Sequence, residues 1–304
     1  MRLTRFAPAP TGFLHLGHVV SAVYVWALAR AHGAQVLLRI EDHDAERCRP
    51  AYERAVLDDL DWLGFEPDVF PTRDFRAGTC ASRQSERAHH YTAVARDLGR
   101  RGLIYGCTCS RQHLADASVA GADGERQYPG TCRTRGHAPG DDVAWRLVMD
   151  AGEERFTDLL AGSQTQDPSA QCGDLVIRDR LGNWTYQFVA SVDDFLQGID
   201  LIVRGRDLLA STGRQIRIAR LAGRERPATF AHHPLVMKTA TQKLSKSDRD
   251  TGVADLRAAG WTAERVIGEA ARAIGIASRP DLSAREAIGL VASRTIGTSP
   301  GTSC

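Results

Sequence analysis

The amino-acid sequence predicts an α/β fold organised around an open parallel sheet. Short apolar runs at residues 3–7, 36–40 and 201–203 are typical of buried strands, and an unbroken apolar segment at 19–31 predicts a buried helix between the first two. Polar or charged residues follow the strands. Because the carboxyl ends of parallel strands meet at one crevice, these residues are the first candidates for a functional site.

Composition is that of an ordinary globular protein. The 304 residues are 43% hydrophobic and 25% charged, which supports one large α/β domain with an appendage or two domains. A formal net charge of +2 means that any nucleic-acid contact must come from a local patch. No apolar run reaches transmembrane length, and early prolines interrupt a signal-peptide core. We therefore expect a soluble, cytoplasmic, monomeric protein without a membrane partner.

The first predicted strand ends at Pro8 and Pro10, and the first predicted helix follows. His15, Gly17 and His18 therefore lie where a strand is succeeded by a helix. The amides and the positive dipole of a helix start suit an anionic group such as phosphate, and Gly17 leaves room for a ligand against the backbone. A plain loop with two polar histidines is the alternative.

A second motif, Lys243-Leu244-Ser245-Lys246-Ser247, follows a predicted strand at 234–237. The lysine ammonium is a compact cation with three donors, so Lys243 and Lys246 suit a polyphosphate. Taken alone, the segment favours a solvated basic turn.

In this order and this far apart, the two motifs resemble the HIGH and KMSKS signatures of class I aminoacyl-tRNA synthetases. The resemblance covers roughly residues 3–248 and implies a Rossmann-type catalytic domain. Further segments resemble the glutamyl and glutaminyl branch of that family: Arg5-Phe6-Ala7-Pro8, the run 39–44, Tyr186 and the run 202–205.

The resemblance implies a binding site for L-glutamate. Two arginine forks, Arg5 and Arg204, would grip the two carboxylates, and Glu41 would hold the ammonium group. Surface ion pairs, a helix cap at Glu41 and a half-buried aromatic at Tyr186 are the alternatives. Ala9 stands where the family usually has serine, so one hydroxyl is absent. The complete predicted site is Arg5, Phe6, Ala7, Pro8, Ala9, Glu41, Tyr186 and Arg204.

The implied reaction is activation of glutamate by ATP with Mg²⁺. The catalytic residues would be His15, His18, Lys243 and Lys246, and the ATP-binding residues would be His15, Gly17, His18 and Lys246. In this role the histidines donate to phosphate oxygens, while the lysines stabilise the departing pyrophosphate.

Predicted helices at 51–63 and 82–101 precede a polar, glycine-rich stretch at 105–142. The chain has seven cysteines, an odd number with uneven spacing that argues against a secreted disulfide framework. Three of them lie in this stretch: Cys107, Cys109 and Cys132. Thiolates are good zinc ligands, and a structural site needs four ligands.

On the residues alone the fourth ligand is Tyr128, His113 or His137, and His137 is favoured because phenolate is an uncommon ligand. A metal-free loop is a further alternative. The pattern Cys-x-Cys followed by Tyr-x3-Cys resembles the zinc site of the glutamyl-queuosine tRNA(Asp) synthetases. That resemblance implies one structural Zn²⁺ held by Cys107, Cys109, Tyr128 and Cys132.

Strand character returns at 143–149 and 174–178, and a helix is predicted at 208–221. Four arginines recur on one face of the latter helix and just beyond it: Arg214, Arg217, Arg220 and Arg224. Such a stripe could follow a phosphate backbone or form a solvated face. Helices are expected at 254–259, 262–275 and 283–294, before a disordered tail at 296–304.

These observations divide the chain into a first catalytic half at 1–104, a zinc-binding insertion at 105–142, a second catalytic half at 143–248 and a short helical C-terminal region at 249–304. About fifty residues follow the lysine motif, too few for the anticodon-binding region of full-length glutamyl-tRNA synthetases.

The shortened end and the zinc pattern together resemble the glutamyl-queuosine tRNA(Asp) synthetases. This implies tRNA-independent glutamate activation and transfer to the queuosine base in the tRNA(Asp) anticodon. The alternatives are a truncated or discriminating glutamyl-tRNA synthetase that charges a tRNA 3′ end, and a non-catalytic nucleotide- or RNA-binding paralogue.

Overall fold

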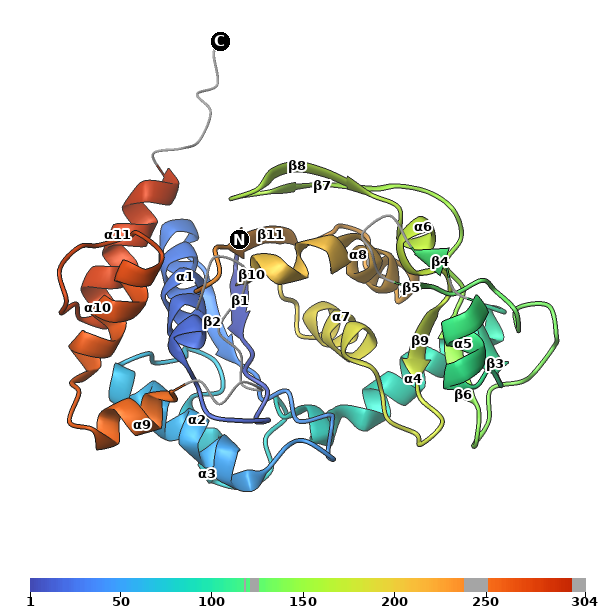
Figure 1. Cartoon of the computed structure of the whole chain (residues 1–304), viewed down its shortest axis with the longest axis horizontal. Helices are drawn as coiled ribbons and strands as arrows, with labels where there is room; N and C mark the ends of the chain where they lie inside the picture. The colour runs from blue at the N-terminus through green and yellow to red at the C-terminus, as the bar shows by residue number, and fades with distance from the viewer. Residues whose placement is uncertain (118, 121–125, 238–250, 297–304) are drawn as a thin grey trace, which may run out of the picture. The chain divides into compact units, whose positions relative to one another are not determined.

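The computed structural model describes residues 1–117, 119–120, 126–237 and 251–296 (Figure 1). The chain forms two compact units. The first contains Met1–Glu86, Ile199–Asp207 and Thr229–Cys304, and the second contains Arg87–Gly198 and Leu208–Ala228. Each unit is assembled from segments far apart in the sequence. The four domain ranges predicted above remain a prediction.

The first unit is built on a parallel sheet in the order β2-β1-β10-β11. The strands are β1 (Leu3–Phe6), β2 (Gln35–Leu38), β10 (Leu201–Gly205) and β11 (Thr229–His233). Their parallel arrangement confirms the predicted α/β class. The prediction of a strand at 234–237 was wrong, because β11 ends at His233. The next residue, Pro234, has no amide hydrogen to donate to a neighbouring strand.

Helix α1 (Leu16–His32) connects β1 to β2 and is buried along most of its length. It ends at Gly33, whose φ of 62° is the left-handed conformation that glycine adopts easily. The C-terminal helices are α9 (Val253–Ala258), α10 (Ala263–Ala273) and α11 (Ala284–Ile296). Helices α10 and α11 pack along α1, on the side away from the sheet (Figure 1), and α9 packs against α10. These three were predicted to within two residues at each end, and the predicted tail lies outside the described residues apart from Ile296, which ends α11.

Helix α2 packs against the other side of this core and contains a buried carboxyl group. Asp59 of α2 is 0% exposed, and within the described part of the chain its carboxylate oxygens have no hydrogen-bond partner. Its nearest cation is Arg257 of α9, at 3.8 Å. The elements here are α2 (Pro50–Leu63), α3 (Thr72–Arg76) and the 3-10 turn η1 (Gln84–Arg87).

The second unit contains an antiparallel sheet in the order β3-β6-β9 and a hairpin formed by β7 and β8. A buried cluster joins α4, α7 and α8 to the sheet. The strands are β3 (Ile104–Cys107), β4 (Val119–Ala120), β5 (Arg126–Gln127), β6 (Ala144–Leu147), β7 (Glu154–Asp158), β8 (Gly162–Gln166) and β9 (Leu175–Arg178). The helices are α4 (Ala88–Arg100), α5 (Arg111–Ala117), α6 (Pro168–Cys172), α7 (Tyr186–Leu196), the 3-10 turn η2 (Arg206–Ser211) and α8 (Thr212–Leu221).

In the described ranges, no helix has the length and apolar character needed to cross a membrane.

Candidate active site and metal centre

His15 and His18 lie at the junction of β1 and α1, as the sequence predicted. His15 caps α1, because its Nδ1 accepts a hydrogen bond from the Gly17 amide at 3.1 Å. Nδ1 of His18 accepts one from the His15 amide, also at 3.1 Å, and the ring centroids are 4.0 Å apart. Since each Nδ1 accepts, a neutral ring carries its proton on Nε2. Both Nε2 groups are therefore donors, as phosphate oxygens require.

Gly17 allows this arrangement of the two rings. A Cβ at this position would lie 2.8 Å from Cε1 and 3.0 Å from Nδ1 of His15, closer than real contacts allow. The sequence suggested that Gly17 makes room for a ligand. In the structure the His15 ring lies in the space where a side chain at this position would begin.

Arg5 and Arg204 lie near the carboxyl ends of adjacent strands, β1 and β10, and each is 5% exposed. Nη1 of Arg5 donates to the Val203 carbonyl at 3.0 Å. Nε of Arg204 donates to Nε2 of His232 at 2.9 Å, and the two residues are register partners on β10 and β11. These bonds fix the direction of both guanidinium groups.

Glu41 follows β2 and is 6% exposed. Its Oε1 accepts a hydrogen bond from Nη2 of Arg39 at 2.9 Å, and Arg39 is completely buried. The backbone joins this segment to the end of β1, because the Arg39 amide donates to the Phe6 carbonyl at 3.0 Å and the Glu41 amide to the Pro8 carbonyl at 3.1 Å. The predicted residues at 5–9 and Glu41 therefore belong to one local structure.

The remaining predicted residues are distributed as follows. The Phe6 ring packs against Trp26 with centroids 5.6 Å apart, and the Ala9 carbonyl accepts from the Thr11 amide at 2.9 Å. Tyr186 is half-buried at the start of α7, in the second unit. Lys243 and Lys246 lie outside the described residues.

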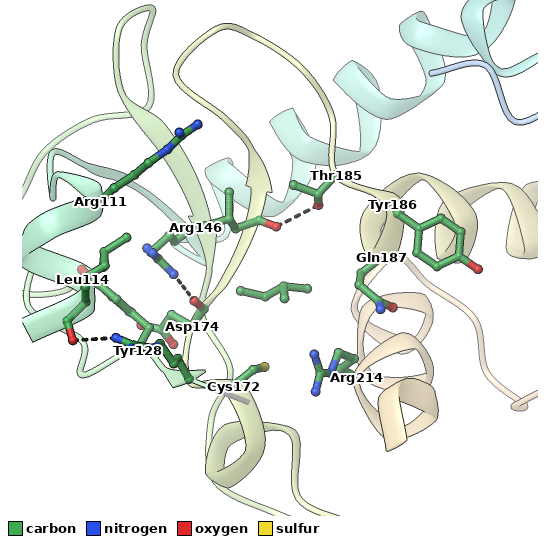
Figure 2. A pocket seen from close by; sticks show the side chains of 14 residues that line it. Arg111, Leu114, Tyr128, Arg146, Cys172, Asp174, Thr185, Tyr186, Gln187 and Arg214 are labelled. Carbon is green, nitrogen blue, oxygen red and sulfur yellow. Dashed lines mark hydrogen bonds between the residues drawn. The ribbon is translucent and has the colours of Figure 1, made fainter. Parts of the chain in front are cut away.

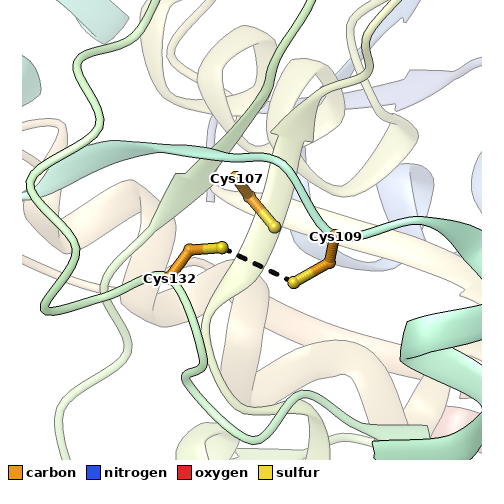
Figure 3. Close-up of side chains that lie close together, drawn as sticks. All are labelled: Cys107, Cys109 and Cys132. Carbon is orange, nitrogen blue, oxygen red and sulfur yellow. Dashed lines mark hydrogen bonds between the residues drawn. The ribbon is translucent and has the colours of Figure 1, made fainter.

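A cysteine cluster forms at the end of β3, where the three Sγ atoms of Cys107, Cys109 and Cys132 lie within 4.8 Å of one another (Figure 3). The thiols are free, and the Cys109–Cys132 distance is 3.5 Å. The Tyr128 hydroxyl lies 3.5 Å from Sγ of Cys107 and 3.8 Å from Sγ of Cys109. A tetrahedral zinc ion with bonds of about 2.3 Å separates its sulfur ligands by about 3.8 Å, so this donor set fits the ion.

The cluster favours Tyr128 over a histidine as the fourth donor. His113 and His137 are exposed, and in the described ranges neither joins the group of potential metal-ligating atoms. The Tyr128 backbone is fixed by its amide, which donates to the Cys172 carbonyl at 3.0 Å. Gly173 makes this close approach possible, since a Cβ there would lie 2.2 Å from the Tyr128 carbonyl oxygen.

Burial and hydrogen bonding give the Cys109 and Cys132 thiols different pKa values. Burial raises the pKa of Cys109 to about 11 and raises the pKa of Tyr128 well above its usual value. Burial also acts to raise the pKa of Cys132, but hydrogen bonds from the Thr108 amide and from Tyr128 outweigh it and lower this pKa to about 6. Cys132 therefore becomes the thiolate that a metal binds more readily than Cys109 does.

The arginines predicted to form a stripe on and just beyond α8 bond mainly to other groups of the second unit. Arg217 and Arg220 both bond to Glu154, which is 1% exposed. Arg224 donates to the Asp194 carbonyl at 3.3 Å, and Arg214 is 3% exposed. Arg217 and Arg220 thus compensate a buried carboxylate, which is a structural role.

Comparison with known proteins identifies the family. Residues 2–282 match the model for the catalytic domain of class I tRNA synthetases (E and Q). A protein of Dechloromonas aromatica named Glutamyl-Q tRNA(Asp) synthetase is 42% identical over 256 residues, which are 84% of this chain and 81% of that protein. One of the same name from Geobacter sulfurreducens is 42% identical over 82% of this chain and 77% of its own length. This chain belongs to the glutamyl-Q tRNA(Asp) synthetase family.

Solved structures agree with this assignment. A glutamate tRNA ligase from Elizabethkingia meningosepticum, crystallised with its amino acid, matches with a TM-score of 0.74 and 25% identity over 94% of this chain. The chain covers 64% of that ligase, somewhat less than two thirds of its length. Membership of the glutamyl-Q tRNA(Asp) synthetase family makes the chain an ATP-dependent ligase, which removes the non-catalytic paralogue as an alternative.

The sequence analysis did not identify two residues that hold candidate site residues in place, Arg39 beside Glu41 and His232 beside Arg204. Arg39 lies inside an apolar strand run two positions before Glu41, so both side chains point to the same face of an extended chain. That spacing was an available signal. His232 gave none, because its role depends on the register of β10 against β11.

Proposed function

We propose that the protein activates L-glutamate with ATP, without requiring tRNA, and transfers the glutamate to the queuosine base in the anticodon of tRNA(Asp). The observation that carries this proposal is the 42% identity, over 84% of the chain, to a protein named Glutamyl-Q tRNA(Asp) synthetase. The charged residues of the first unit support it.

In this proposal Arg5 and Arg204 bind the two carboxylates of glutamate, and Glu41 binds the ammonium group. Two buried guanidinium groups oriented by Val203 and His232 are pre-organised for such anions, so little entropy is lost on binding. The charge pattern of two cations and one anion complements glutamate. Tyr186 would contribute a wall of the same pocket.

The activation step needs no protein nucleophile, because the substrate supplies one. The α-carboxylate of glutamate attacks the α-phosphorus of ATP, the bond to the bridging oxygen breaks, and pyrophosphate leaves with that electron pair. His15 and His18 would donate from Nε2 to phosphate oxygens, and Lys243 and Lys246 would neutralise the leaving pyrophosphate. Mg²⁺ would accompany ATP and reduce its charge.

We also propose that Cys107, Cys109, Tyr128 and Cys132 hold one structural Zn²⁺. The ion would cross-link β3 to the loop that contains Tyr128 and Cys132, and so would add folding energy to a polar segment. The purified protein should contain about one zinc equivalent. Replacing Cys107 and Cys109 together with serine should remove the metal and lower Tm, while His137→Ala should change neither. Metal-free protein of full stability would contradict the site.

The transfer step is tested by supplying glutamate, ATP and Mg²⁺ with tRNA(Asp) that contains or lacks queuosine. Both substrates should also be prepared without the 3′-terminal adenosine, so that only the anticodon can accept. Mass spectrometry of the digested RNA should find glutamate on the queuosine nucleoside alone. Absence of that adduct, with intact glutamate-dependent ATP–pyrophosphate exchange, would refute the acceptor assignment.

The likeness to a glutamate tRNA ligase favours a second candidate, charging of a tRNA 3′ end. Glutamylation of unmodified tRNA(Glu), lost when its terminal adenosine is removed, would support this function instead.

A further inference from the structure

The second unit contains a cavity of about 660 Å³ to which the proposal above assigns no ligand (Figure 2). This volume lies within the range of roughly 300–1,000 Å³ that is typical of small-ligand sites. Side chains from α5, β5, β6, α6, β9, α7 and α8 surround it, and Tyr128 of the cysteine cluster and Tyr186 both line it.

The lining of this cavity is strongly cationic. It contains Arg111, Arg126, Arg146 and Arg214 but one carboxylate, Asp174. That carboxylate is already engaged, because its oxygens accept hydrogen bonds from the Tyr105 hydroxyl at 2.7 Å and the Met149 amide at 2.8 Å. In a chain whose net charge is only +2, this is a local excess of positive charge.

Arg146 points most clearly to an anionic ligand. It is 5% exposed, and in the described part of the chain no carboxylate lies within 4.0 Å of its guanidinium. Nη1 donates to the Asp174 carbonyl at 2.6 Å, the guanidinium stacks on the Tyr128 ring at 3.5 Å, and Nε has no hydrogen-bond partner among the described residues. By contrast, the buried Arg87 of the same unit is paired with Asp193 at 2.6 Å. A buried cation without a counter-ion is costly unless a ligand supplies one.

Other walls of the cavity are apolar and suit a flat ring. Leu114 and Ala115 of α5, with Leu175 and Val176 of β9, contribute aliphatic surface. A phosphate attached to a planar base, whose faces can pack on an apolar wall, is the chemistry of a nucleotide.

We propose that this cavity binds one nucleotide of the acceptor tRNA, with a phosphate paired to Arg146 and Arg111 and a base against the aliphatic wall. The inference rests on the proposed function, which supplies a tRNA substrate.

Two variants test the cavity, one at an exposed position and one that keeps the charge of a buried position. Arg111 is exposed and makes no hydrogen bond or ion pair with the described residues, so Arg111→Ala should fold normally. Arg146→Lys keeps the charge but loses the planar fork. Arg155→Ala is the matched control, since Arg155 is exposed on β7, outside the lining, and pairs with Glu153 at 2.7 Å.

The assay is fluorescence anisotropy with an anticodon stem–loop RNA of tRNA(Asp), between 50 and 200 mM KCl. Arg111→Ala should weaken binding about threefold and lower the slope of log K against log salt by roughly 0.7–0.9, the value for one phosphate contact. Arg146→Lys should weaken binding roughly tenfold. The control should match the wild type in both quantities.

Wild-type affinity and salt slope in both cavity variants would overturn the proposal. So would a loss of glutamate-dependent ATP–pyrophosphate exchange as large as the loss of RNA affinity, because the cavity would then belong to the activation site. If RNA binding depends on these arginines but queuosine-containing tRNA(Asp) is never glutamylated, the cavity stands and the proposed acceptor fails.

Discussion

The ion pair between Arg39 and Glu41 offers a sharp test of the site's construction. Arg39→Met keeps most of the side-chain volume and removes the guanidinium, so the carboxylate of Glu41, 6% exposed, loses the only hydrogen bond that described residues make to it. Breaking a buried ion pair from one side costs about 3–5 kcal/mol. Because domains of this kind are stable by about 5–15 kcal/mol, the loss is a large fraction of the total.

The measurement is equilibrium unfolding in urea. With a slope of about 2–3 kcal/mol per molar, the midpoint of Arg39→Met should fall by roughly 1–2 M. The double variant Arg39→Met/Glu41→Gln should lose less than the sum of the two single variants, by about 2 kcal/mol, because it leaves no unpaired buried charge.

A matched surface pair provides the control. Arg155 and Glu153 lie 2.7 Å apart with side chains 78% and 51% exposed, so their removal should cost less than about 1 kcal/mol. Strictly additive losses for Arg39 and Glu41, or a loss as small as that of the surface pair, would refute the view that this ion pair holds the Glu41 carboxylate in place.

Further predictions concern pH, packing and positioning. Burial raises the pKa of Asp59 to about 7, so the folded state retains a proton that the unfolded chain releases near pH 4, and the wild type loses stability as the pH rises from 4 to 7. The free energy of unfolding of Asp59→Asn should therefore rise relative to that of the wild type over this range, by at most about 4 kcal/mol in thermal or urea unfolding. An equal difference at pH 4 and at pH 8 would contradict this prediction. Gly17→Ala should displace the His15 ring and reduce the rate of ATP–pyrophosphate exchange about tenfold or more, with Tm nearly unchanged. Full exchange activity in this variant would show that the position of the ring does not matter. His232→Phe removes the acceptor for Nε of Arg204, so the KM for glutamate should rise roughly tenfold while the KM for ATP stays constant. Equal changes in the two KM values would indicate general misfolding instead.

The local pattern of the sequence determined the framework of this protein. Apolar runs with helical or extended periodicity predicted the strands β1, β2 and β10 and the helix α1, and they also located the three C-terminal helices. The two spaced motifs and the cysteine pattern indicated a synthetase of the glutamyl branch. These signals are readable because periodicity and motif spacing are properties of neighbouring residues.

The tertiary structure decided which residues hold the functional groups in place. His232 meets Arg204 because of strand register, Tyr128 completes the cysteine cluster because Gly173 lets two backbone segments approach, and the cationic cavity collects side chains from seven elements. Such contacts join positions tens of residues apart. No local pattern in the chain encodes them, because they depend on how buried surfaces pack and on which strands become neighbours.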